Sequence, residues 1–165
     1  MTHFSNRLKT LSYRPSLASA LAISMALAGV TMTTAYADDA LKMTLEANQV
    51  LKQADGTVKY SPISTAKAGT VVQYEATYSN TIDQPISDVS VTLPIPQNMA
   101  FTGEAYPASA QGSTDGTNFA DMPLMKRVDG KLVKVPYADY TALRWNIKYL
   151  PAKKSASVTL NAVVE

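Results

Sequence analysis

The chain has 165 residues, with 15 Lys and Arg, 13 Asp and Glu, one His and no Cys. The only histidine is His3, and no acidic residue precedes Asp38. If residues 1–37 are removed, 128 residues remain with 12 basic and 13 acidic side chains, a net charge of −1. That part lacks both His and Cys, which excludes Ser-His-Asp and Cys-His nucleophiles, a Cys/His zinc site, haem ligation through His and any disulfide.

The beginning of the chain has the three parts of a secretory signal peptide. Residues 1–14 carry basic but no acidic side chains, and residues 17–32 are apolar and compatible with a helix. Ala35 and Ala37 place small side chains at the two positions that a signal peptidase reads. The sequence therefore predicts a helical signal peptide that is cleaved before Asp38.

The signal peptide predicts where the protein acts. No twin-arginine pair is present, which favours the general secretory route. We expect a protein of the periplasm, the cell surface or the extracellular space, which meets the membrane only transiently through its signal peptide. The alternative is an uncleaved N-terminal membrane anchor, which would need about 20 apolar residues, more than this run provides.

The rest of the chain alternates apolar and polar residues with a period of two, as β-strands do. Each run would show one face to a core and the other to water, which is typical of antiparallel sheets. No window predicts an amphipathic helix. The expected strands cover residues 41–47, 58–61, 72–78, 89–93, 99–106, 123–128, 131–135, 143–149 and 156–164.

Turn residues lie between these runs. There are three Asp-Gly pairs, and the clearest is Asp129-Gly130, which predicts a two-residue hairpin turn. We expect one domain over 38–165, an all-β, antiparallel, immunoglobulin-like β-sandwich of about seven to nine strands. Trp145 is expected to fill its core, and 106–121 is the one long irregular stretch, where function tends to lie.

Residues 68–165 resemble the bacterial conserved-repeat domain, a large family of domains of unknown function (the DUF-eleven family). The matching positions are Gly69, Val72, Tyr74, Asn80-Thr81, Pro85, Val89, Val91, Leu93-Pro94, Phe101, 113–119, Leu143-Arg144-Trp145 and Leu150-Pro151. The resemblance implies an immunoglobulin-like sandwich of a kind that is often arrayed in tandem on bacterial surfaces, here in a single copy. It implies no catalytic residue, because the matching motifs belong to the scaffold.

The loop at 106–121 contains oxygen donors that could bind a metal ion. Asp115, Thr117, Asn118 and Asp121 lie within seven residues, and extracellular Ca²⁺ sites can be weak. The spacing is not that of an EF-hand. The alternative, which we favour, is a polar turn in which Asp and Asn side chains bind their own backbone. We expect no cofactor and no metal.

Four basic residues, Lys126, Arg127, Lys131 and Lys134, lie close together on the expected hairpin. They could attract an anionic surface such as lipopolysaccharide, nucleic acid or an acidic protein. The alternative, which we favour, is that they protect an exposed edge from aggregation. The net charge of −1 argues against nucleic acid, for which a basic domain is expected. This hairpin is the best candidate for a partner surface.

Aromatic and carboxylate side chains offer two weaker sites. Tyr106, Tyr137 and Tyr140 could line a sugar- or peptide-binding surface, or plug an end of the sandwich. A catalytic carboxylate needs an apolar setting that raises its pKa, and Glu104 is the one candidate.

These observations predict an exported module of the bacterial envelope that acts by protein interaction or self-association and is not an enzyme. One alternative is a periplasmic protein that binds a small ligand or Ca²⁺ through residues 106–121. A third interpretation is a hydrolase that uses Glu104.

Overall fold

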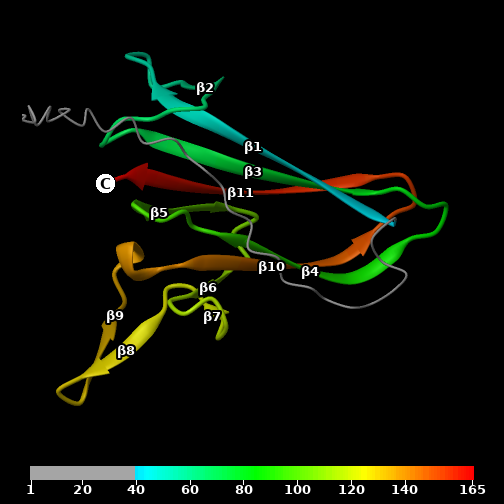
Figure 1. Cartoon of the computed structure of the whole chain (residues 1–165). Coiled ribbons are helices and arrows are strands. Elements are labelled where there is room, and N and C mark those ends of the chain that lie inside the picture. Colours follow the sequence, from blue (N-terminus) through cyan, green and yellow to red (C-terminus); the bar gives the residue numbers. More distant parts are fainter. Residues whose placement is uncertain (1–39) are drawn as a thin grey trace, which may run out of the picture.

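Two antiparallel β-sheets pack face to face in the computed structural model, which describes residues 40–165 (Figure 1). The all-β sandwich predicted from the sequence is therefore confirmed. The predicted signal peptide and its cleavage residues, Ala35, Ala37 and Asp38, lie outside the described residues. Within 40–165 no helix is long and apolar enough to span a membrane.

The larger sheet has five strands in the order β2-β1-β3-β11-β5. Their bounds are β1 (Leu41–Lys52), β2 (Val58–Pro62), β3 (Val71–Asn80), β5 (Met99–Tyr106) and β11 (Ser155–Val164).

The smaller sheet has four strands in the order β4-β10-β6-β7, and β8 and β9 form a separate two-stranded hairpin. The hairpin is followed by one short 3-10 turn, η1 (Tyr137–Asp139). The remaining bounds are β4 (Ile86–Pro94), β6 (Gln111–Ser113), β7 (Ala120–Asp121), β8 (Met125–Val128), β9 (Lys131–Lys134) and β10 (Ala142–Leu150).

The core lies between the middle strands of the two sheets. Along β3 every second residue is buried, which is the predicted period of two. β10 supplies Leu143 and Trp145 from the opposite sheet, and both are at most 2% exposed. The buried side chains of β3 and β11 that face them are Val72, Tyr74, Ala76, Tyr78, Val158 and Leu160.

The structure corrects the prediction of a long irregular stretch at 106–121, because that stretch contains β6 and β7. Together with the other short strands they bring the total to eleven, more than the predicted seven to nine. β6 pairs with β10, and Gly112 of β6 lies against the ring of Tyr140. A side chain at residue 112 would collide with that ring, so the position requires glycine. A three-residue strand with glycine at its centre shows no apolar alternation in the sequence.

The exposure of Met43 is a second correction. The alternation of β1 places Met43 on the core face, but the side chain is 44% exposed. The smaller sheet covers the middle of the larger one, where β3 and β11 lie, and β1 lies towards its margin. Leu41, Leu45 and Ala47 are accordingly only partly buried against the core.

The predicted hairpin turn at Asp129-Gly130 is confirmed. β8 and β9 pair antiparallel up to Val128 and Lys131, so the turn has two residues. Asp129 has a φ of 50° and Gly130 a φ of 79°, the positive values that a tight turn of this hand requires.

Trp145→Ala should lower the free energy of unfolding by about 3–5 kcal/mol, the usual range for truncating a large buried aromatic side chain. Trp145 is 2% exposed, and its indole Nε1 donates a hydrogen bond to the carbonyl of Pro107 at 2.9 Å. Urea unfolding measures the loss. Trp145→Phe is the control, because it keeps most of the buried ring and should cost less. An unchanged midpoint for Trp145→Ala would contradict the buried position.

Candidate interaction surface

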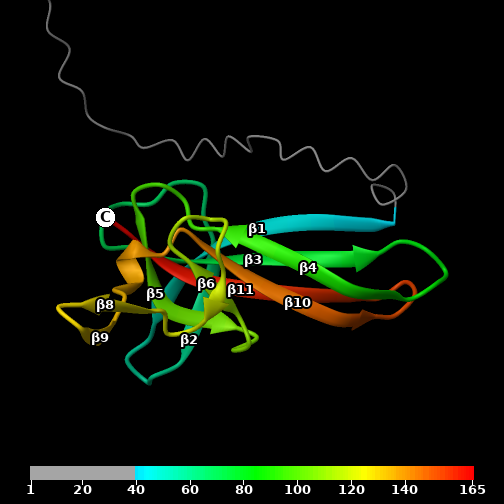
Figure 2. The same ribbon diagram turned by 90° about the horizontal axis from the view of Figure 1, so that it is seen from below.

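The β8–β9 hairpin projects from the end of the sandwich near β5 and η1 (Figures 1 and 2). Its two strands pair only with each other among the described strands, and all eight of their residues are exposed. An isolated two-stranded hairpin is marginally stable in water, so this one depends on its attachment to the domain.

The register shows that each face of the hairpin carries both basic and apolar side chains. Residues directly opposite each other share a face. One face carries Met125, Arg127, Leu132 and Lys134. The other carries Lys126, Val128, Lys131 and Val133. The four predicted basic residues are thus divided between two faces, and each pair lies beside two exposed apolar side chains.

Core contacts hold the base of the hairpin. Val135, directly after β9, is buried, and its N–H donates to the carbonyl of Leu124 at 2.9 Å. The N–H of Leu124 in turn donates to the hydroxyl of Tyr140 at 2.7 Å. The Tyr140 ring is 2% exposed and packs against Phe101 and Tyr137, with centroids 5.7 and 5.4 Å away. Burial raises the pKa of Tyr140 above its ordinary value.

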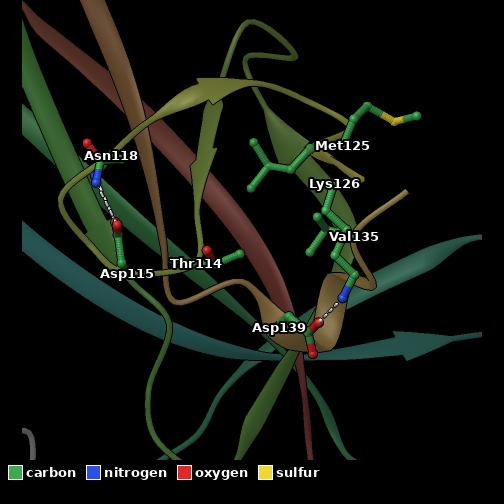
Figure 3. A pocket seen from close by; sticks show the side chains of 8 residues that line it. Thr114, Asp115, Asn118, Met125, Lys126, Val135 and Asp139 are labelled. Atoms are coloured by element: carbon green, nitrogen blue, oxygen red, sulfur yellow. Dashed lines mark hydrogen bonds and ion pairs between the residues drawn. The ribbon is translucent and has the colours of Figure 1, made fainter. Parts of the chain in front are cut away.

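An open depression of about 370 Å³ lies between the base of the hairpin and the loop after β6 (Figure 3). Lys126 on one side forms an ion pair with Asp139 at 3.6 Å, and both side chains are half exposed. Asp115 and Asn118 line the opposite side, together with Thr114. The structure therefore brings the two candidate sites of the sequence, the oxygen-rich loop and the basic hairpin, to one depression.

The carboxylate of Asp115 organises the loop after β6. Its Oδ1 accepts hydrogen bonds from the backbone N–H groups of Thr117 and Asn118, at 2.8 and 2.7 Å, and from the hydroxyl of Ser113 at 2.9 Å. Its Oδ2 accepts a bond from the amide Nδ2 of Asn118 at 2.7 Å. The bonds from Asn118 and Thr117, followed by that from Ser113, hold the pKa of Asp115 well below its ordinary value. These are the bonds of the polar-turn interpretation.

Two of the four candidate calcium ligands, Asp115 and Asp121, accept hydrogen bonds from other groups of the protein. Asp121 accepts a bond from the Nε2 of Gln111 at 3.1 Å, and the oxygens of Asp115 face their own loop. Thr117 is exposed. Among residues 40–165 no group of three or more His, Cys, Asp or Glu side chains could hold a metal ion. Binding of Ca²⁺ through 106–121 stays an alternative to the polar turn.

The three tyrosines do not form one surface. Tyr140 and Tyr137 pack with Phe101, but Tyr106 is 69% exposed and takes no part in that cluster. Glu104 is exposed, and its Oε2 accepts a hydrogen bond from the Nδ2 of Asn161 at 2.6 Å.

Sequence reasoning missed the parts that anchor the hairpin and make it apolar. The contact from Tyr140 to Leu124 joins residues 16 positions apart, and only the fold shows it. The sequence does contain a sign of the exposed apolar side chains. Met125 and Val128 lie on opposite faces of their strand, and so do Leu132 and Val133. That pattern indicates a hairpin with no core face.

Comparisons with known proteins give no match. No family model matches the chain, and no curated protein or solved structure is similar enough to it to count as a match.

Asp115→Asn should destabilise the protein most at neutral pH. The folded state lowers the pKa of Asp115, so its stabilising effect is present above the unfolded value, about 3.9, and is lost as the pH falls towards the folded value. The gap in melting temperature between wild type and Asp115→Asn should therefore shrink below about pH 4. Thermal melts between pH 3 and 7 measure it. A gap that is constant across this range would contradict the assigned hydrogen bonds.

Proposed function

We propose that this chain is an exported β-sandwich module of the bacterial envelope that binds a protein partner through the β8–β9 hairpin. The observation that carries the proposal is the hairpin itself, with eight exposed residues on a base that is fixed in the core. The signal-peptide pattern before Asp38 supports export by the general secretory route. The resemblance of residues 68–165 to the conserved-repeat family, which often occurs on bacterial surfaces, supports the same role.

The chemistry of the hairpin favours an acidic protein surface as its target. Lys131, Lys134 and Arg127 make no ion pair with the described residues, so their charges are open to a partner. Apolar side chains beside them, such as Leu132 at 57% exposure, would gain from burial. Both outer edges of the hairpin also leave backbone groups for pairing with a strand of the partner. A partner with an open strand edge and carboxylates on either side of it fits these three features.

Export is tested by fractionation of cells that produce the full chain, followed by intact-mass measurement. The expected result is a periplasmic or extracellular protein whose mass begins at Asp38. A protein of full mass in the inner membrane would contradict the cleaved signal peptide and favour the membrane anchor.

The partner surface is tested by a photo-cross-linking residue placed at Leu132. We expect a discrete protein adduct in intact cells, and its loss when Lys131→Glu and Lys134→Glu are added, because the reversed charges would repel an acidic partner. The same residue placed at Tyr149, which is 60% exposed on β10, is the matched control. Equal adducts from both positions, or an adduct that survives the charge reversal, would contradict the proposal.

A further inference from the structure

One part of β1 has a partner strand on one side only. β2 pairs with residues 48–52 of β1, and its last contact is the bond from the N–H of Ile63 to the carbonyl of Ala47 at 3.0 Å. Residues 41–46 pair with β3 and with no other strand of the described chain (Figure 1). An open stretch of regular strand is a template for another chain.

The register shows which backbone groups of this stretch point outward. The carbonyl of Ala40 accepts a bond from the N–H of Thr81 in the β3 direction, at 2.8 Å. Successive residues of a strand direct their backbone groups to opposite sides, so the even-numbered residues of β1 bond to β3. Leu41, Met43 and Leu45 therefore direct their N–H and C=O groups to the open side.

The other edges of the two large sheets are interrupted, and this one is regular. β4 contains Asp88 with a φ of 54°, and β5 contains Gly103 with a φ of 93° and a register shift against β11. β2 has five residues and ends at Pro62, and β7 has two. Such interruptions protect edges from pairing. The stretch 41–46 has no proline, glycine or positive φ within it.

The sequence of the open stretch is complementary to itself. If two copies pair antiparallel about Thr44, then Lys42 of each copy lies opposite Glu46 of the other. Met43 then lies opposite Leu45, and both are residues whose backbone groups point outward. Pairs of opposite charge and of apolar residues across two strands are the favourable ones. Pairing about Thr44 therefore matches opposite charges, places apolar side chains together and joins the outward backbone groups in hydrogen bonds.

Glu46 belongs to a like-charge pair in the sheet, and a nearby cation would reduce the repulsion within that pair. Glu46 lies directly opposite Glu75 of β3 in the register. Neither carboxylate forms an ion pair with another described residue. Like charges directly opposite each other are destabilising. Lys42 of a second copy would bring a positive charge to this pair.

The open stretch ends where β2 meets β1. An open depression of about 490 Å³ lies where β2 leaves β1, lined by Glu46, Ala47, Asn48, Pro62, Ile63 and Ser64. Ile63 already takes the position opposite Ala47 and donates its N–H to the Ala47 carbonyl, so a pairing about Thr44 extends from residue 42 to residue 46.

We propose that residues 42–46 of β1 bind the same residues of a second copy, which makes a two-fold symmetric dimer with one continuous sheet. A two-fold interface of this kind uses the same patch on both subunits. The inference deepens the proposed interaction role by naming a partner, but it concerns a surface other than the hairpin. Either proposal can fail without the other.

Light scattering after size exclusion tests the dimer, on protein recovered from cells that produce the full chain. Wild type is expected at twice the mass of one chain. Lys42→Glu and Glu46→Lys should each reduce the mass to that of one chain, because like charges would then face each other. The double variant should restore the dimer with the charges exchanged. Lys52→Glu is the matched control, since Lys52 lies on the same strand where β2 already covers it.

Hydrogen exchange gives a second measurement that does not depend on the charge variants. The N–H groups of Met43 and Leu45 should exchange slowly in the wild-type dimer and at least 10-fold faster in the Lys42→Glu variant, at the rate of unpaired strand. A monomeric wild type, fast exchange at these two amides, or a double variant that stays monomeric while folded would overturn the proposal. A dimer that persists in both single variants would place the interface elsewhere and overturn it as well.

Discussion

The buried side chain of Asn80 holds one end of the two sheets together, and the rest of the sandwich depends on this link. Asn80 is 2% exposed, and its Nδ2 donates to the carbonyls of Gln84, Leu150 and Pro151 at 2.8, 3.2 and 3.0 Å. Its Oδ1 accepts a bond from the N–H of Ile82. The turn from β3 to β4 is thereby fixed to the turn from β10 to β11. In a chain without cysteine, a satisfied amide takes the place that a disulfide could fill.

The opposite end of the sandwich is closed by aromatic rings, and that closure positions the hairpin. Tyr137 of η1 lies against Gly103 of β5, where a side chain would collide with the ring. Phe101 and Tyr140 complete the cluster, and the hydroxyl of Tyr140 holds Leu124 just before β8. The hairpin therefore starts from a rigid point although its own residues are exposed. An arm with a fixed base loses less conformational entropy on binding than a free loop.

The sequence predicts those parts of the fold that repeat along the chain, and it misses those that depend on distant contacts. β3 could be predicted from its alternation because one of its faces is covered by the core, where Val72, Tyr74, Ala76 and Tyr78 are buried. β6 and β7 are too short for a period, and Gly112 is explained only by the ring of Tyr140. The basic residues of the hairpin were visible in the sequence. The open edge at 41–46 was not, since it depends on how far β2 extends along β1.

The β8–β9 hairpin and the open edge of β1 differ in the signs of their charges, and this difference favours different partners. Lys126, Arg127, Lys131 and Lys134 all have the same sign, so two hairpins brought together would repel each other, whereas an acidic surface would attract them. The β1 edge carries Lys42 and Glu46 at equal distances from Thr44, so a copy turned by a two-fold axis presents the opposite sign at each position. Lysines on one edge discourage self-pairing, and balanced charges on the other favour it. A dimer joined through β1 would hold two hairpins in one assembly, and an acidic partner with repeated sites would then bind through both, with an avidity that exceeds the affinity of one hairpin.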